Sequence, residues 1–384
     1  MMKAIMVIID GLADEKMNEL NGQTTYESAH HPNLDRLAAG AVTGYFDSCP
    51  QGYTPESMPC ILNLLGIDPV YYPQSRASLE LLANGYKLED DEVVLRCNLA
   101  AVDNSNHLIS FNGGNLTHIE MKKAVEAIND TPMDIRLIHL SDYRNLLIMK
   151  KRYFQALRCK NYPPHEYVGD NVDVLLADIC AKAPILKEFV SAAMEKLKNY
   201  REDKLTYILY PWGISEKSSL PTFQELYSLN AAAVCGTEIA RGIAIALGMT
   251  LANPTGMTGD TDTDLILKAK TTCAMLDNHD FVFVHINGTD EAAHRYDLRE
   301  KISFIERIDR EFFRIILDEL SPDTRIYVCA DHGTSPLSGK HTVLDVPYII
   351  KKPFWKNEMS ITTAPGALTE LKAADVLNYL LTVQ

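Results

Sequence analysis

Three short apolar segments, rich in β-branched residues, constrain the fold of this chain more than any other feature of its 384 residues. They are Lys3–Ile9, Asp280–Asn287 and Arg325–Ala330. Continuous apolar runs of this length are typical of strands that are buried on both faces, as in a parallel sheet covered by helices. The sequence therefore predicts an α/β fold with a parallel central sheet flanked by helices.

The stretch between the second and third segments supports this fold class. Residues 298–317 carry apolar side chains at helical spacing, namely Ile302, Ile305, Ile308, Phe312 and Ile316. A strand, a helix and a strand in this order form a right-handed βαβ unit of a parallel sheet.

Residues 101–204 differ in character from the rest of the chain. Short alternating runs are interleaved there with amphipathic helical patterns near 120–128 and 183–198. At about 100–200 residues per domain, a chain of this length forms two domains or one large domain with an insertion. We expect residues 1–100 and 205–384 to form the α/β core and residues 101–204 to form a smaller inserted α+β cap domain.

Charge and cysteine usage narrow the class of protein. The 37 basic and 51 acidic residues give a formal net charge of -14, which argues against a generic nucleic-acid or anionic-membrane binder. The eight cysteines are scattered without a C-x-x-C pair, as in a reduced cytoplasmic protein. No apolar run approaches the length of a membrane span, so we expect no membrane partner.

Acidic and imidazole side chains follow the three expected strands at their carboxyl ends, where parallel sheets place active sites. The group comprises Asp10 after the first segment, Asp290 and His294 after the second, and Asp331, His332 and His341 after the third. Three carboxylates and three imidazoles suffice for two divalent cations, with the mixed oxygen and nitrogen ligands of Mn²⁺ or Zn²⁺ rather than Ca²⁺.

Each of these residues also has an ordinary structural interpretation. An Asp at a strand end is often a helix N-cap or a turn former, and a single His is often a surface or core residue. The joint pattern at three strand ends favours the metal site. Six histidines do not belong to this joint pattern and are interpreted as having no functional role, namely His30, His31, His107, His118, His139 and His279.

Ser57 precedes an apolar helical pattern that has Pro59 in its first turn. On spacing alone, the leading interpretation of Ser57 is a helix N-cap. A hydroxyl at a helix N-terminus is also well placed to be a nucleophile, since the helix dipole favours its alkoxide and attracts a phosphate. The two interpretations are compatible.

Further motifs run through nearly the whole chain. They are IDGLAD at 9–14, LLGIDP at 64–69, RASLELLANG and RCNLA within 76–100, YRNLLI at 143–148, PPH at 163–165, LPTFQELYSLNAAAV at 220–234, TDEAAH at 289–294, ADHGTSP at 330–336 and KHTVLDVPYII at 340–350. With the Ser57 segment, they resemble the cofactor-independent phosphoglycerate mutases of archaeal type, in the alkaline phosphatase superfamily.

The resemblance implies an alkaline-phosphatase-like core with two divalent metal ions, Mn²⁺ or Zn²⁺ with Mg²⁺ as a further option, and no organic cofactor. One ion would be held by Asp290, His294 and His341. The other would be held by Asp10, Asp331 and His332, with Ser57 as its remaining ligand and as the phosphorylated nucleophile.

The activity implied is the interconversion of 3-phosphoglycerate and 2-phosphoglycerate without bisphosphoglycerate, through a phosphoserine. The implied partner is a small phosphorylated metabolite, and the implied location is the cytoplasm. The resemblance does not decide whether the protein is a monomer or a homo-oligomer. Basic residues inside the matching motifs would hold the substrate's other anionic groups, a task that suits bidentate arginine. These are Arg76, Arg96 and Arg144, followed by Lys217 and Lys340. Surface or interdomain salt bridges are the alternative for each.

Four positions depart from the family pattern. Glu56 and Met58 flank Ser57 where the family has Gly and Asp, Ile61 replaces an Asn, and Glu216 stands at a basic position. Three alternatives therefore remain: a small-metabolite kinase resembling homoserine kinase with ATP as donor, a phosphatase or phosphonate hydrolase, and a catalytically silent metal-binding protein. The hypothesis of a catalytically silent protein predicts that metal ligands have been lost, whereas all seven matched positions keep side chains that can bind a metal.

Overall fold

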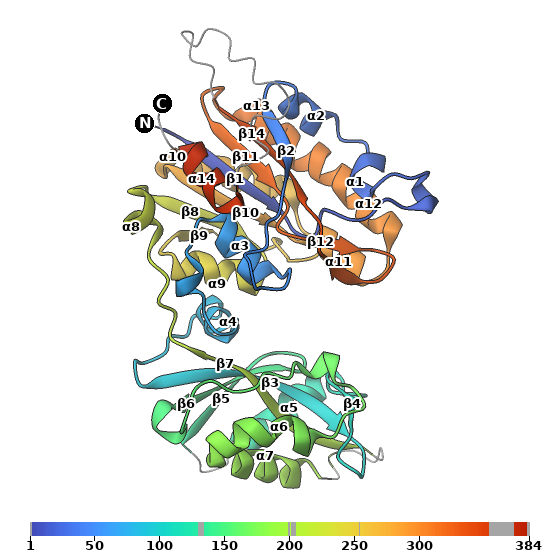
Figure 1. Ribbon diagram of the computed structural model, residues 1–384, viewed down its shortest axis with the longest axis vertical. Helices are drawn as coiled ribbons and strands as arrows, with labels where there is room; N and C mark the ends of the chain where they lie inside the picture. Colours follow the sequence, from blue (N-terminus) through green and yellow to red (C-terminus); the bar gives the residue numbers. More distant parts are fainter. Residues whose placement is uncertain are drawn as a thin grey trace. The chain divides into compact units, whose positions relative to one another are not determined.

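The computed structural model describes residues 2–129, 134–198, 200, 205–252, 254–352 and 372–381 (Figure 1). By their internal packing, these residues divide into two compact units. The core unit comprises Met1–Tyr72 and Ser219–Gln384, and the inserted unit comprises Pro73–Ser218. Each unit is described by itself.

The inserted unit extends beyond the expected limits of 101 and 204 on both sides. Strands β3 (Glu92–Val102) and β7 (Thr206–Glu216) pair with each other in the sheet of the inserted unit. The apolar run of β7 was expected to resume the core. A continuous buried run shows that both faces of a strand are covered, but it does not show which sheet the strand joins.

The core unit is built on a seven-stranded sheet with the order β2-β14-β11-β1-β10-β8-β9. The five strands from β11 to β9 are parallel, and β14 pairs antiparallel with both β11 and β2. Their bounds are β1 Ala4–Ile9, β2 Val42–Phe46, β8 Ala231–Cys235, β9 Thr250–Ala252, β10 Phe281–Ile286, β11 Arg325–Cys329 and β14 Val346–Lys351. The predicted α/β fold with a mostly parallel central sheet is confirmed.

The three expected strands form the centre of this sheet, with β1 between β10 and β11. The two strands of the expected βαβ unit are therefore parallel but not adjacent. In the register, Ile9 lies opposite Ile286, and Ile8 lies opposite Cys329. Because the three strands end level with one another, the residues that follow them meet at one edge.

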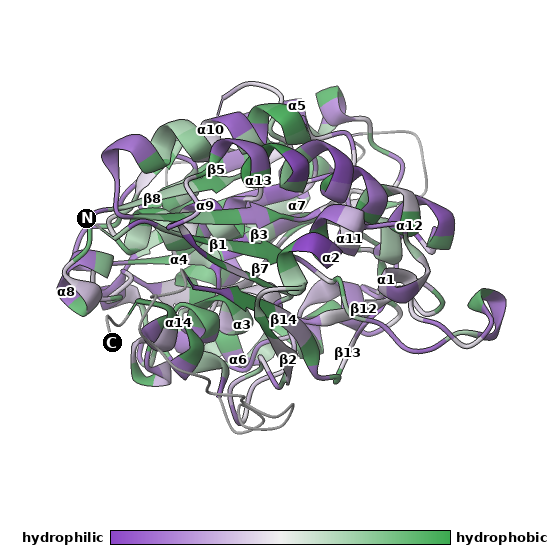
Figure 2. Ribbon diagram, turned by 90° about the horizontal axis from the view of Figure 1, so that it is seen from above, coloured by the Kyte–Doolittle hydropathy of each residue, from purple (hydrophilic) through white to green (hydrophobic). Residues whose placement is uncertain are grey.

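Two groups of helices cover the core sheet (Figures 1 and 2). One group comprises α3 (Ser57–Leu64), α9 (Glu238–Ala246) and α14 (Ala373–Leu381), and the other comprises α2 (Pro32–Ala38), α10 (Leu265–Asn278), α12 (Leu298–Arg307) and α13 (Arg314–Glu319). A π-helical turn, Ile308–Phe313, joins α12 to α13 within the expected helix. The shorter elements are α1 (Thr25–Ser28), α8 (Phe223–Tyr227), α11 (Gly288–His294), and a hairpin of β12 (Gly333–Ser335) and β13 (Lys340–Thr342). In the described part of the chain, no helix is both long and apolar enough to span a bilayer.

The inserted unit is an antiparallel sheet in which β3 pairs with β4, β6 and β7. Its further elements are β4 (Leu108–Ser110), β5 (Ile135–Ser141), β6 (Arg144–Lys150), α4 (Ala77–Ala83), α5 (His118–Asn129), α6 (Val172–Lys182) and α7 (Pro184–Leu197). Alternate residues of β3 point to opposite faces. Val93 and Leu95 join the apolar cluster that contains α6 and α7, whereas Val94 packs with Ala77 and Leu81 of α4.

A distant carboxylate caps helix α2. His31 at its N-cap makes no side-chain capping bond. Instead, the buried Asp309 of the π-helical turn accepts hydrogen bonds from the backbone N–H of Leu34 at 2.7 Å and of Asn33 at 3.2 Å. This carboxylate satisfies two backbone donors that a helix start leaves without partners.

We expect Asp309→Ala to lower the free energy of unfolding by about 2 kcal/mol, because the buried N–H groups of α2 lose a charged acceptor. Urea denaturation followed by circular dichroism measures the change. The control is Asp318→Ala, which removes an exposed partner of Arg36 and should change stability by less than about 0.5 kcal/mol. Equal effects of the two substitutions would contradict the capping role.

Candidate active site

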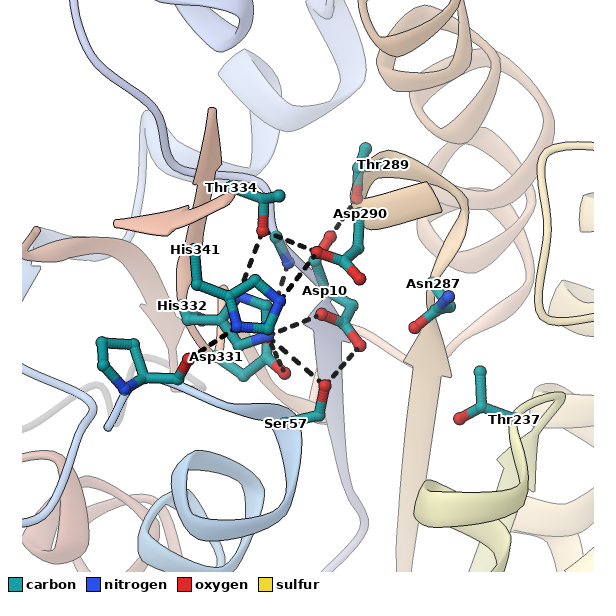
Figure 3. A network of polar contacts seen from close by, with 12 residues as sticks. Asp10, Ser57, Thr237, Asn287, Thr289, Asp290, Asp331, His332, Thr334 and His341 are labelled. Atoms are coloured by element: carbon teal, nitrogen blue, oxygen red, sulfur yellow. Dashed lines mark hydrogen bonds and ion pairs between the residues drawn. The ribbon is translucent and has the colours of Figure 1, made fainter. Parts of the chain in front are cut away.

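Three carboxylates meet at the carboxyl edge of the core sheet (Figure 3). Asp10 directly follows β1, Asp331 follows β11 within two residues, and Asp290 lies on α11 after β10. All three side chains are buried. Burial, followed by the charges of Asp331 and Asp290, raises the pKa of Asp10 well above its usual range. A buried cluster of like charges of this kind is stabilised by a bound cation.

The first group of candidate ligands is Asp290, His294 and His341, whose ligand atoms all lie within 4.8 Å of one another. Helix α11 places Asp290 and His294 on one face, with His294 Nε2 3.2 Å from Asp290 Oδ2. His341 lies on strand β13, where residues 340–342 pair with 333–335. Its Nε2 is 3.2 Å from His294 Nε2.

The hydrogen bonds of the Nδ1 atoms show how the rings of His294 and His341 are oriented. His294 Nδ1 donates to the carbonyl of Gly339 at 2.9 Å, and His341 Nδ1 donates to that of Pro55 at 2.7 Å. Since a carbonyl oxygen only accepts, each ring turns its Nε2 toward the other ring and toward Asp290. The hydrogen bond to Asp290 raises the pKa of His294 to about 9, so without a metal ion its Nε2 holds a proton in the place that an ion would take. Metal-binding histidines are held in this way by a hydrogen bond from the other ring nitrogen. These three residues therefore fit a divalent ion.

The second group surrounds Asp10. His332 Nε2 lies 3.2 Å from Asp10 Oδ1 and 3.7 Å from Asp331 Oδ2. The ligand atoms of Asp10, Asp290 and His332 also lie within 4.8 Å of one another. Asp10 Oδ1 and Asp331 Oδ2 are buried acceptors without a hydrogen-bond partner, which is costly unless a cation or donor occupies the space between them. These residues also fit a divalent ion.

Ser57 is the first residue of α3, and Glu56 occupies the N-cap without a side-chain capping bond. The capping interpretation of Ser57 is therefore wrong. Its hydroxyl instead donates to Asp10 Oδ2 at 3.3 Å and lies 3.3 Å from His332 Nε2 (Figure 3). The N-cap and the first helical position differ by a single residue, and only the packing of α3 at the sheet edge decides which of them Ser57 occupies.

Two buried residues near this edge escaped the sequence reasoning. Lys301 Nζ lies 2.8 Å from each of Asp14 Oδ2, the carbonyl of Gly11 and the carbonyl of Thr334. It ties the loop after β1 to strand β12. Its position one turn before Ile305, on the apolar face of α12, could have marked it as buried.

The other residue is His285, inside β10, with its Nε2 3.0 Å from Asp10 Oδ2. Burial lowers the pKa of His285 to about 4, so the ring is neutral. A lone histidine in an otherwise apolar strand was the available signal.

The three candidate arginines belong to the inserted unit. The Nε atoms of Arg76 and Arg96 lie 2.8 and 3.1 Å from the two carboxylate oxygens of Glu80, and Arg144 donates to Ser141 Oγ at 2.7 Å. Arg96 also stacks on Trp212, 4.2 Å from the ring centroid. Burial, followed by the charge of Arg76, lowers the pKa of Arg96 to about 10. Three guanidinium groups thus share one neighbourhood with one carboxylate.

The lysine candidates and the acidic departure at Glu216 lie in different surroundings. Lys217 forms an exposed ion pair with Asp90 at 2.7 Å. Glu216 pairs with Lys151 at 2.7 Å, so its charge is compensated within the inserted unit. Lys340 is exposed on β13 of the core unit, next to His341.

Comparisons with known proteins show the family to which the chain belongs. A family model described as the metalloenzyme superfamily matches residues 2–382. The 2,3-bisphosphoglycerate-independent phosphoglycerate mutase 2 of Methanothermobacter thermautotrophicus is 31% identical over 91% of this chain and 88% of its own length. The chain belongs to this archaeal mutase family, within the metalloenzyme superfamily. The corresponding mutase of Methanopyrus kandleri is 31% identical over 98% of this chain and 95% of its own length. The expected resemblance is confirmed.

Solved structures show the same fold. The PH0037 protein from Pyrococcus horikoshii is 28% identical with a TM-score of 0.75, covering 91% of this chain and 87% of that one. A cofactor-independent phosphoglycerate mutase from Thermoplasma acidophilum, at 19% identity and a TM-score of 0.62, covers 99% of both chains. As a member of the metalloenzyme superfamily with clustered carboxylate and imidazole ligands, the chain binds divalent metal.

We expect Lys301→Met to lower the free energy of unfolding by about 3 kcal/mol, because the substitution leaves the buried carboxylate of Asp14 without its cation. The double variant with Asp14→Asn removes that charge and should regain most of the loss. Chemical denaturation of the single and double variants measures both values. A double variant as unstable as the single one would show that the ion pair is not the cause.

Proposed function

We propose that the protein interconverts 3-phosphoglycerate and 2-phosphoglycerate without bisphosphoglycerate, by transferring a phosphoryl group through Ser57. The observation that carries the proposal is the position of the Ser57 hydroxyl, 3.3 Å from both Asp10 Oδ2 and His332 Nε2. Membership of the archaeal mutase family supports the choice of substrate. A small phosphorylated metabolite is then the partner of the site.

Two divalent ions are part of this proposal. One is assigned to Asp290, His294 and His341, and the other to Asp10, Asp331 and His332 together with Ser57. Mixed carboxylate and imidazole donors favour Mn²⁺ or Zn²⁺, with Mg²⁺ as the weaker option. When bound, such ions lower the pKa of a coordinated hydroxyl and neutralise the phosphoryl oxygens.

The chain's own residues supply the nucleophile and the proton acceptor. Ser57 Oγ attacks the phosphorus, the bond from phosphorus to the substrate oxygen breaks, and glycerate leaves with that oxygen, which takes up the proton that Ser57 gives up. Asp10 Oδ2, which accepts the hydrogen bond of Ser57, is placed to take the hydroxyl proton. The other hydroxyl of the reoriented glycerate then attacks the phosphoserine and restores Ser57. Helix α3 directs the positive end of its dipole toward the phosphate.

Arg76, Arg96 and Arg144 are proposed to hold the carboxylate and the non-reacting phosphate oxygens. Glu80 orients two of the guanidinium groups and keeps them rigid. Arginine suits this task because its fork of donors matches a carboxylate or a phosphate in two parallel hydrogen bonds. Lys217, already paired with Asp90 on the surface, is assigned a minor role.

We expect Ser57→Ala to abolish isomerisation while leaving the fold and the bound Mn²⁺ nearly unchanged. A ³¹P NMR time course with Mn²⁺-loaded protein and 3-phosphoglycerate measures the reaction. Wild-type protein and the control Ser28→Ala should form 2-phosphoglycerate without free phosphate.

Two results would contradict the proposal. Free phosphate as the main product would indicate a phosphatase. An unchanged spectrum from metal-loaded wild-type protein would instead favour the kinase alternative, which ATP and homoserine then test.

We expect Arg96→Lys to raise the KM for 3-phosphoglycerate about tenfold, because lysine keeps the charge but loses the bidentate fork. Lys217→Met should change KM less than about threefold, since an exposed ion pair contributes little. A coupled steady-state assay measures both values, and circular dichroism verifies the fold. An equal change in the two variants would remove Arg96 from the substrate site.

A further inference from the structure

We propose that His285 is a fourth imidazole ligand of the metal centre, binding the ion held by Asp10 and Asp331 through its Nε2 atom. This inference rests on the metal centre of the proposed function and adds a ligand to it. The ligand atoms of Asp10, His285 and Asp331 all lie within 4.8 Å of one another. All three residues are buried.

The unpartnered atoms at this point carry the argument. His285 Nε2, Asp10 Oδ1 and Asp331 Oδ2 are all buried and all lack a hydrogen-bond partner. His285 Nε2 is only 3.0 Å from Asp10 Oδ2, yet the two are not aligned as a hydrogen bond. Buried polar atoms are nearly always satisfied, and three exceptions at one place call for a common cause. A cation bound by all three atoms satisfies them together.

The Nδ1 atom of His285 has a polar partner, as do the Nδ1 atoms of the other three candidate histidines. Its Nδ1 lies 3.4 Å from Thr237 Oγ1, and that hydroxyl makes no capping bond to helix α9. His294 and His341 donate Nδ1–H to carbonyl oxygens, and His332 Nδ1 lies 3.2 Å from Thr334 Oγ1. All four rings thus direct Nε2 at the carboxylates, the arrangement expected of metal ligands.

The backbone of His285 is fixed from three sides. It pairs with Ile8 of β1 and with Cys235 of β8 in the centre of the core sheet. The buried Lys268 donates to its carbonyl oxygen at 2.9 Å. A ring held this firmly is a preorganised ligand rather than a mobile side chain.

A fourth imidazole has a consequence for the choice of metal. Imidazole ligands favour Zn²⁺ over Mg²⁺, which prefers oxygen ligands. With His285, the ion at Asp10 and Asp331 receives two imidazoles, counting His332, instead of one. We therefore infer that this site selects against Mg²⁺.

The test is NMR of full-length protein labelled with ¹⁵N in its histidine rings and loaded with ¹¹³Cd²⁺ alone. A through-bond ¹¹³Cd–¹⁵N coupling appears only where the nitrogen binds the ion. We expect four coupled Nε2 atoms in wild-type protein. His285→Gln should leave three, and the control His139→Gln, in the inserted unit, should leave four.

Wild-type protein alone decides the question if His285→Gln fails to fold. Coupling to His294, His332 and His341 but not to His285 would overturn this inference and leave the proposed metal centre intact. Protein that binds no ¹¹³Cd²⁺ at these histidines would overturn the proposed centre as well. As a second readout, calorimetry should show Zn²⁺ affinity reduced at least about tenfold at one site in His285→Gln.

Discussion

The convergence of Asp10, Asp290 and Asp331 at one edge of the core sheet is the constraint on which the rest of this site depends. Three buried carboxylates repel one another, and burial and mutual charge already raise the pKa of Asp10. Imidazoles face this cluster, and in the proposed function bound metal ions neutralise it. The level ends of β10, β1 and β11 bring the three side chains together.

Much of the surrounding structure holds these charges in place. Lys301 joins the loop after β1 to strand β12, and Thr334 donates to Asp290 Oδ1 at 2.6 Å. Thr289 donates to the carbonyl of Asp10. Fixed ligands of this kind reduce the reorganisation that metal binding and phosphoryl transfer require. Ser57 gains its position in the same way, from the packing of α3 at the sheet edge.

The inserted unit contains a cluster of positive charge, in contrast to the carboxylates of the core unit. The chain carries a net charge of -14, so an anionic substrate needs a local concentration of positive charge. In the proposed function, Arg76, Arg96 and Arg144 around Glu80 are assigned this task. Burial, followed by repulsion from Arg76, lowers the pKa of Arg96. Glu216, which departs from the family pattern, has its charge compensated by Lys151.

The sequence by itself determined the central strands and named most of the candidate ligands. Apolar runs identified β1, β10 and β11, helical spacing placed Asp290 and His294 on one face, and the motifs identified the family. Only the tertiary structure decided that β1 lies between the other two strands, that β7 joins the inserted sheet, and that Ser57 faces Asp10 rather than capping α3. It alone brought Asp309 to α2, Lys301 to Asp14 and His285 to Asp10. The physical reason is that periodicity reports whether a side chain is buried, whereas its partner is set by contacts between residues far apart in the chain.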